Sequence, residues 1–292
     1  MISIIVTAYK EPKTIGRAIN SLLENRLPNQ YEVLVLAPDN ETLNEAGKIA
    51  KNNKKIRIIK DRGEGKPAAL NLAFKKVRGN IIVLTDGDVF VDKEAIPRLL
   101  EKFEDKKVGA VGARPVSLNS KDNKFGFWSH LLTNVADLRR RRAVRNNKRF
   151  FCSGYLFAMR SGIVKEIPEE TLSDDGLMSY MVYKAGYKIE YLPDSKVYVK
   201  YPTNFKDWIS QKKRSAGGYS QIKKWTGQDI RSFLSESFGA GDFFRGISNL
   251  REFLWLIELF IARIYLWMVI FKEINIQQKS HKAVWVRVSS TK

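Results

Sequence analysis

The motif Asp86-Gly87-Asp88 carries residue types and spacing that are well suited to chemistry. It follows four apolar residues and a threonine at 81–85, a short run typical of a buried strand in a parallel sheet. Ligands of open α/β sheets bind beyond the carboxyl ends of such strands. Two adjacent carboxylates in that place favour a divalent cation, which offsets their repulsion. The alternative is an Asp-Gly-Asp surface turn, and the motif alone does not decide between the two.

Other candidate residues occur at similar positions along the chain. Lys66 lies in the segment GEGKPAALN, just before a predicted helix, where flexible backbone and a helix N-terminus suit phosphate oxygens. A turn with an exposed lysine explains the same segment. Ser173-Asp174-Asp175 also has two readings, because a serine and two acids before an apolar run are typical of a helix N-terminus. Each signal is weak alone, so their order along the chain is the stronger evidence.

Alternating strand and helix patterns position these motifs. The sequence predicts strands at 2–7, 31–36, 56–59 and 81–85, and helices at 14–23, 42–50 and 67–77. This alternation indicates an α/β fold with a mostly parallel sheet covered on both faces. Later segments predict helices at 94–103, 125–144 and 174–185, strands at 108–113, 189–192 and 196–199, and an apolar stretch at 151–159. We expect a catalytic domain at 1–203 and a helical region at 204–292.

Composition and cysteine content indicate a globular protein of a reducing compartment. The chain has 292 residues, 44% hydrophobic and 28% charged, enough to bury a full core. Its one cysteine excludes an internal disulfide framework. No secretory leader is visible, because Met1 is followed directly by a strand pattern. We therefore expect a cytoplasmic location.

The charge is strongly basic and uneven. The net charge of +20 divides into about +6 on residues 1–120 (21 basic, 15 acidic) and about +14 on residues 121–292 (30 basic, 16 acidic). The densest run, RRRRAVRNNKR at 139–149, holds seven basic residues in eleven. This field favours nucleic acid, anionic lipid headgroups or phosphorylated substrates, and a solvated helix face explains the run equally well.

A long apolar segment lies near the end of the chain. Residues 253–271 contain two charged side chains, Glu258 and Arg263, and as a helix they span about 28 Å, just enough to cross a bilayer core. A buried helix, a helix in the membrane interface and a true span all fit. Aromatic residues within the segment and basic residues at both ends favour association with an anionic membrane surface.

Taken in order, the motifs resemble the family 2 inverting glycosyltransferases, which have the Rossmann-like GT-A fold, and the resemblance covers roughly residues 2–215. It implies a donor nucleotide site, with Asp88 as metal ligand for Mg²⁺ or Mn²⁺. It also implies a donor and acceptor loop and Asp175 as the general base. The implied nucleotide-binding residues are Thr7, Ala8, Tyr9, Glu11, Asp39, Lys66 and Asp86. Ser153 and Gly154, within a Ser-Gly-x-x-x-x-x-Arg segment ending at Arg160, and Asp174 match the donor and acceptor loop.

Gln211 and Arg214 narrow the resemblance to one subgroup of the family. Their spacing is similar to the Gln-x-x-Arg-Trp motif of cellulose-, chitin- and hyaluronan-synthase-like enzymes, and it implies contacts with the diphosphate and acceptor. The tryptophan position holds Ser215, so we expect Tyr219 or Trp225 to supply any stacking surface. One candidate membrane helix does not form a polymer channel alone, which favours the addition of one or a few sugars.

The resemblance predicts a metal-dependent transfer of sugar from a UDP-sugar to a hydroxyl or phosphate of an anionic or lipid-linked saccharide acceptor, as in polysaccharide biosynthesis. We expect a protein at the cytoplasmic face of the membrane that binds no nucleic acid. Two alternatives remain open. A polyprenyl-phosphate sugar synthase of the dolichyl-phosphate type uses a related donor site, and a non-catalytic nucleic-acid-binding protein explains the charge.

Overall fold

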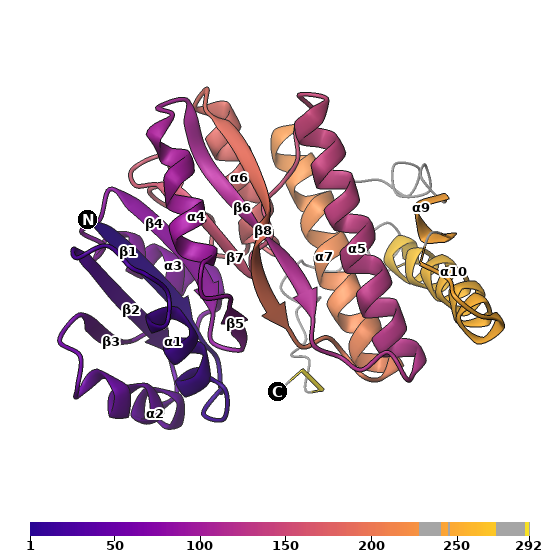
Figure 1. Ribbon diagram of the computed structural model, residues 1–292, viewed down its shortest axis with the longest axis horizontal. Coiled ribbons are helices and arrows are strands. Elements are labelled where there is room, and N and C mark those ends of the chain that lie inside the picture. Colours follow the sequence, from indigo (N-terminus) through magenta and orange to yellow (C-terminus); the bar gives the residue numbers. More distant parts are fainter. Residues whose placement is uncertain (228–240, 245, 273–289, 292) are drawn as a thin grey trace.

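An eight-stranded mixed sheet forms the centre of the protein in the computed structural model, which describes residues 1–227, 241–244, 246–272 and 290–291 (Figure 1). The strands are β1 (Ile2–Thr7), β2 (Tyr31–Ala37), β3 (Ile56–Lys60), β4 (Ile81–Asp86), β5 (Val89–Val91), β6 (Val108–Ser117), β7 (Leu156–Arg160) and β8 (Lys188–Val199). The helices are α1 (Ile15–Leu23), α2 (Asn40–Ala50), α3 (Lys66–Phe74), α4 (Ala95–Glu101), α5 (Lys124–Arg145), α6 (Asp174–Lys184), α7 (Phe205–Thr226), α9 (Gly241–Phe244) and α10 (Leu250–Phe271). A short 3₁₀ turn at Lys102–Glu104 follows α4.

The first four predicted strands form the parallel half of the sheet, as the sequence indicates. The strand order is β3-β2-β1-β4-β7-β6-β8-β5, and the first four pair in parallel. Alternate side chains enter two cores, because successive residues of a strand point to opposite faces. Helices α1, α2 and α4 pack on one face, and α3 and α6 pack on the other. The prediction of a mostly parallel sheet covered on both faces is therefore confirmed.

The second half of the sheet departs from the parallel pattern. Strand β7 lies antiparallel between β4 and β6, and β5 pairs antiparallel with β8 at the far edge. The two short strands predicted at 189–192 and 196–199 are one strand, β8. The register of its pairing with β6 shifts between Leu192 and Lys196. This irregularity explains why the strand pattern in the sequence is interrupted there.

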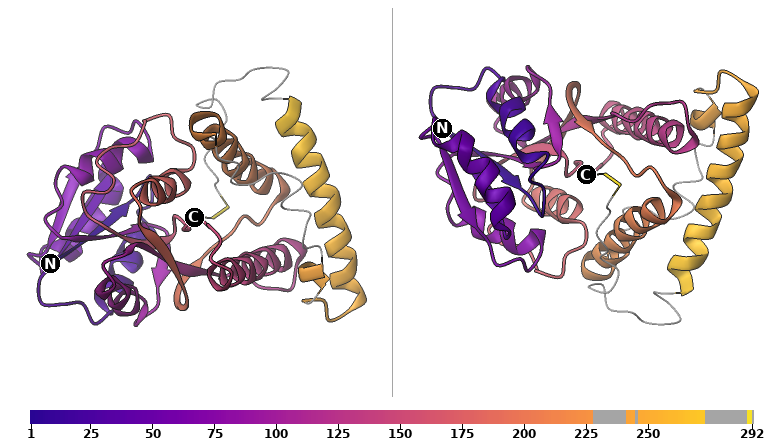
Figure 2. Two further views of the ribbon diagram at one scale, coloured as in Figure 1. Left: turned by 90° about the horizontal axis from the view of Figure 1, so that it is seen from above. Right: turned by 90° about the horizontal axis from the view of Figure 1, so that it is seen from below.

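The later helices form a third core. Side chains of α5, α7, α9 and α10 pack together around Trp128, Trp208 and Phe243. Helix α10 crosses the outer side of α5 and α7 and lies at one edge of the molecule (Figure 2). It begins at Leu250, earlier than the predicted 253. Residues 228–240, 245, 273–289 and 292 of the predicted helical region lie outside the described residues.

Asn71 fixes the connection between β7 and α6. Its buried amide donates to the Ile167 carbonyl at 2.8 Å and accepts from the Ile167 amide at 2.9 Å. This two-way contact holds the chain that leads to Asp174 and Asp175 against α3. The asparagine of the GKPAALN segment thus has a structural role.

Replacing Asn71 by Ala should lower the free energy of unfolding by about 2 kcal/mol, because it leaves the buried Ile167 amide without its acceptor. Urea unfolding checks this value. The exposed Asn52→Ala serves as the control and should change the free energy by less than about 0.5 kcal/mol. Equal stability of the two variants would contradict the assigned role.

Candidate active site

Strand register brings Thr7 and Asp86 together at the carboxyl edge of the sheet. The two residues are paired across β1 and β4, and the Thr7 hydroxyl donates to Asp86 Oδ1 at 3.1 Å. The amide of Gly87 donates to the Thr7 carbonyl at 2.9 Å. The turn after β4 is therefore attached to the turn after β1, so the candidate residues of both segments share one edge.

Gly87 permits a close approach that a surface turn does not need. A Cβ atom at this position would lie 2.6 Å from Glu11 Oε2 and 2.7 Å from Ala8 Cβ. Both contacts are too short for any residue with a side chain. The Asp86-Gly87-Asp88 turn is thus packed against the residues predicted to line the nucleotide site, and the reading as an exposed surface turn is wrong.

Lys66 lies between two carboxylates. Its ammonium group is 2.6 Å from Asp86 Oδ1 and 3.4 Å from Asp174 Oδ2. Burial alone lowers the pKa of Lys66, but the charges of Asp174 and Asp86 outweigh it and raise the pKa above its ordinary value. Burial raises the pKa of Asp174, Lys66 opposes this shift, and Asp175 and Asp86 reinforce it. The predicted phosphate-binding lysine is therefore also the cation that stabilises the acidic cluster.

Asp39 organises the two turns beside the sheet edge. One carboxylate oxygen accepts from the Thr42 amide and hydroxyl as the N-cap of α2, and the other accepts from the Lys10 amide at 2.7 Å. These hydrogen bonds lower the pKa of Asp39 although burial opposes them. The Thr42 hydroxyl also accepts from the Glu11 amide, so Asp39 holds the Thr7–Glu11 turn in place. Tyr9 in that turn is exposed. The contacts of both residues with a nucleotide stay predictions.

Asp175 is held by donors from two segments. Its Oδ2 accepts from the Gly154 amide at 2.9 Å, and its Oδ1 accepts from the Ser173 hydroxyl and the Gly176 amide. Ser173 occupies the N-cap position of α6, but its hydroxyl bonds to Asp175 and makes no side-chain capping bond. The contact with Gly154 joins the predicted donor and acceptor loop to the predicted base.

Helix α7 fixes this arrangement through residues that the sequence analysis did not identify. The buried Gln221 accepts from the Leu172 amide and donates to the Glu170 carbonyl, both at 2.9 Å. A Cβ on Gly218 would lie 2.6 Å from Ser173 Cβ. Both residues follow Arg214 at helical spacing, but nothing in the local pattern indicates which loop they contact.

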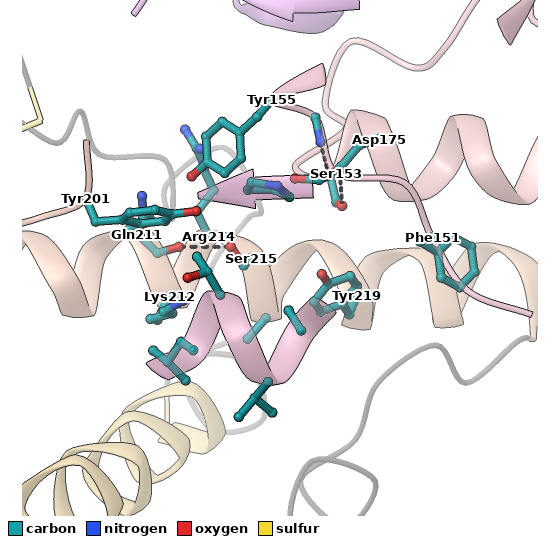
Figure 3. A pocket seen from close by; sticks show the side chains of 18 of the residues that line it. Phe151, Ser153, Tyr155, Asp175, Tyr201, Gln211, Lys212, Arg214, Ser215 and Tyr219 are labelled. Carbon is teal, nitrogen blue, oxygen red and sulfur yellow. Dashed lines mark hydrogen bonds between the residues drawn. The ribbon is translucent and has the colours of Figure 1, made fainter. Parts of the chain in front are cut away.

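A cavity of about 490 Å³ extends from the acidic cluster toward α10. Lys66, Asp86, Ser153, Asp174 and Asp175 line one part of it. Gln211, Arg214, Ser215 and Tyr219 line it from α7, opposite Tyr155 and Tyr201, whose rings meet edge to face (Figure 3). Of the two aromatic residues considered as stacking surfaces, Tyr219 lines the cavity, and Trp225 is exposed and lies outside its lining.

The arginine run at 139–149, which begins in α5 and continues past its end, divides between structural contacts and the cavity. Arg141 binds both oxygens of the buried Asp137 at 3.0 Å, and Arg142 makes a two-pronged contact with Asp242 of α9. The neighbouring Arg139, Arg140 and Arg149 line the cavity. The run is therefore more than a solvated helix face.

Arg160 lies apart from this site. Strand β7 runs antiparallel to β4, so Arg160 pairs with Ile81 at the opposite edge of the sheet. Its guanidinium donates to the carbonyls of Val108, Phe103 and Asp105. Ser153 and Gly154 lie in the cavity, but the arginine that ends the matched segment has a structural role.

The residues fit a metal that is shared with a diphosphate. Among the described residues, no group of three or more His, Cys, Asp and Glu side chains could hold a metal. Asp86 and Asp88 at the sheet edge offer carboxylate oxygens, the ligands that Mg²⁺ and Mn²⁺ prefer. Such cations commonly keep waters and bind one or two carboxylates together with substrate phosphates. We expect Asp88 to be the main protein ligand, because Asp86 already contacts Lys66.

The mixed sheet and its acidic edge are those expected of the GT-A class of glycosyltransferases. Comparison with known families agrees: the profile described as Glycosyltransferase like family 2 matches residues 1–218. The chain belongs to this family, which confirms the family resemblance read from the motifs.

Three related proteins are named as a glycosyltransferase or as a synthase of a sugar-containing product. The chain is 24% identical over 252 residues to a probable glycosyltransferase, YdaM, of Bacillus subtilis, which covers 81% of this chain. It is 23% identical to the poly-β-1,6-N-acetyl-D-glucosamine synthase of Staphylococcus aureus over 76% of this chain. A β-monoglucosyldiacylglycerol synthase of Trichormus variabilis is 30% identical over 44%. The chain spans 58%, 55% and 28% of the lengths of these proteins.

Solved structures share the fold. The mannosyltransferase PcManGT of Pyrobaculum calidifontis, in complex with GDP-Man and Mn²⁺, aligns with a TM-score of 0.59 at 18% identity, over 97% of this chain and 73% of that one. TarS of S. aureus in complex with UDP-GlcNAc aligns with a TM-score of 0.53 at 17% identity, over 73% and 64%. These similarities confirm the predicted GT-A architecture.

Gly87→Ala should weaken nucleotide binding about tenfold or more, because the new methyl group must displace Glu11 or the Asp86–Asp88 turn. Calorimetric titration with UDP and GDP in the presence of Mn²⁺ measures the change. Gly47→Ala is the matched control, since a Cβ there meets nothing within 4 Å. Unchanged affinity in Gly87→Ala would show that the turn does not shape the nucleotide site.

Proposed function

We propose that the protein is a metal-dependent inverting glycosyltransferase that moves a sugar from a UDP-sugar to an anionic, lipid-linked saccharide acceptor. The observation that carries this proposal is the single cavity that joins the acidic cluster around Lys66 to a basic and aromatic compartment. The donor belongs at the acidic end, and the acceptor belongs between α5, α7 and α10.

Hydrogen bonding supports Asp175 as the general base. A carboxylate offers about four acceptor positions, and donors among the described residues fill three of them. The remaining position on Oδ2 is available for the proton of an attacking hydroxyl. The Gly154 amide and Ser173 hydroxyl fix the carboxylate's orientation, so little reorganisation is needed when the proton arrives.

Lys66 and Arg214 suit the departing diphosphate. Lys66 contacts Asp86 at the acidic end of the cavity, and Arg214 lines the same cavity from helix α7. Fixed positive groups stabilise the charge that develops on a leaving diphosphate. Asp88 would hold a bound Mg²⁺ or Mn²⁺, which would supply further charge stabilisation.

The charge of the inner compartment supports an anionic acceptor. Among the described residues that line the cavity, the acidic ones are Asp86, Asp174 and Asp175, all at the donor end. The cationic lining beyond them consists of Arg139, Arg140, Arg149, Lys212, Arg214 and Arg263. Such a compartment attracts phosphate or carboxylate groups of an acceptor. Its aromatic residues, among them Tyr155, Tyr219 and Trp267, offer faces for sugar rings.

A polyprenyl-phosphate sugar synthase is the second candidate, because the same cationic compartment suits a lipid phosphate. The two functions share the donor end and differ in whether a hydroxyl or a phosphate attacks. Gln211, the first residue of the Gln-x-x-Arg element, lines the cavity, and the polyprenyl-phosphate alternative predicts no need for this residue. Family membership disfavours the alternative of a non-catalytic nucleic-acid-binding protein.

The site suits the cytoplasmic side of a membrane, where nucleotide sugars and reduced thiols occur together. Burial raises the pKa of the Cys152 thiol to about 12, with Ser179 opposing the shift. A protonated buried thiol next to Ser153 is inert, so it does not interfere with the chemistry of the site.

Asp175→Asn should lower the rate of sugar transfer by about 10²–10⁴-fold, because the amide cannot accept the proton, while donor affinity changes little. A panel of UDP- and GDP-sugars assayed with Mg²⁺ or Mn²⁺ measures transfer, and titration measures binding. Asp194→Asn, at an exposed position, is the matched control. Retained turnover in Asp175→Asn would refute the assignment of the base.

Arg139→Gln should raise the KM for a phosphorylated lipid acceptor about tenfold and leave the KM for the donor unchanged, because one charge-assisted contact is lost. The effect should shrink at high salt. Arg26→Gln, which removes a largely exposed guanidinium outside the cavity, is the control. A neutral acceptor affected equally would contradict an anionic subsite.

A further inference from the structure

Helix α10 is apolar on two opposite faces. Its inner face packs in the third core through buried residues at positions 256, 259, 262, 266 and 270. Its outer face carries large exposed apolar side chains at alternate steps of four and three residues: Leu250, Leu254, Ile257, Ile261, Ile264 and Met268. Ile261 is 61% exposed and Met268 is 59% exposed. By length and composition α10 is the one described helix that could cross a membrane.

Beyond its first turn, α10 contains two charged residues, Glu258 and Arg263, and neither belongs to this outer stripe. Glu258 pairs with Lys124 of α5 at 2.8 Å. Arg263 lies over the ring of Phe243 and lines the cavity. The outer stripe therefore contains apolar side chains throughout. The two charges that make a free-standing span costly lie outside it, Glu258 half-exposed on the flank of the helix and Arg263 toward the cavity.

We propose that the outer face of α10 docks in the plane of an anionic lipid bilayer, with its apolar stripe at the boundary between headgroups and acyl chains. The helix lies at the edge of the molecule, where a flat surface can reach it (Figure 2). Arg251, beside the ring of Trp255, and the exposed Lys272 stand at its two ends. Basic residues at the ends of an apolar, aromatic helix complement anionic headgroups. The surplus of basic residues after position 120 supports the same partner.

The packing of α10 distinguishes docking from spanning. Its inner face is committed to α5, α7 and α9 from Leu256 to Ile270. A transmembrane orientation would carry Lys124 and the basic lining of the cavity toward the hydrocarbon core, at a high cost in desolvation. An in-plane orientation buries the outer stripe and leaves these groups in water.

Docking also places the proposed acceptor compartment next to the bilayer. Leu266 and Trp267 line the cavity, while Ile264 and Met268 on the same two turns face outward. The membrane then lies about one helix diameter, roughly 10 Å, from the cavity wall. This consequence rests on the proposed function, whereas the docking does not.

Vesicle flotation of the full chain tests the proposal. The protein should float with vesicles of phosphatidylcholine and phosphatidylglycerol, and less with phosphatidylcholine alone. Ile261→Glu and the uncharged Ile261→Gln should each weaken partitioning, the former about tenfold or more. Leu118→Glu is the matched control, since Leu118 is also exposed and lies outside α10. Absence of flotation, or equal loss in Leu118→Glu, would overturn the proposal. A concentration-dependent dimer that Ile261→Glu abolishes, without vesicle binding, would do the same.

Depth measurements test the orientation. A fluorescent label on Leu254→Cys, Ile261→Cys or Met268→Cys is quenched by lipids that carry quenchers at known depths; the native Cys152 is buried. The three positions cover about 21 Å of helix. Equal shallow depths support in-plane docking, and a deepest position at Ile261 shows a span and overturns it. UDP binding, measured in parallel without vesicles, separates failure of docking from failure of the proposed transferase function.

Discussion

The position of the Lys66 ammonium group between Asp86 and Asp174 is the interaction on which the site depends. Asp86 ends a strand, Asp174 begins a helix, and Asp175 lies beside it, so three carboxylates gather in one partly buried place. Their mutual repulsion in a poorly hydrated setting requires a cation at short range. Lys66 supplies that charge from the N-terminus of a third element, α3, and thereby joins the parallel half of the sheet to α6. This end of the cavity is thus held together by contacts within the protein itself.

Close backbone approaches determine the shape around this charge cluster. Gly87 brings the acidic turn onto the Thr7–Glu11 turn, and Gly218 brings α7 onto Ser173. The antiparallel insertion of β7 places Gly154 next to the end of β4, where its amide reaches Asp175. The approaches at Gly87 and Gly218 depend on the lack of a side chain, so the backbone shapes the site around the charge cluster.

The parts of the fold and of the site that the sequence predicts are those with strong local patterns. Apolar runs ending in polar residues indicated β1, β2 and β4, and parallel pairing then placed Thr7 beside Asp86. The family resemblance selected Lys66, Asp174 and Asp175, which the structure brings together. Sequence did not indicate the support from Gln221 or the structural role of Arg160, because both depend on contacts between residues 49 or more positions apart. The division of the arginine run likewise depends on Asp137 and Asp242, and only tertiary packing reveals these partners.

Helices α5 and α7 also fix the distance between the sheet and α10. Helices α5 and α7 are each 22 residues long, and α10 lies across them through a common core. Packed helices keep axes about 8–10 Å apart and resist compression. They act as a rigid spacer that sets a minimum reach between the outer edge of the protein and Asp175. A molecule that entered from that edge would have to extend past both helices to reach Asp175.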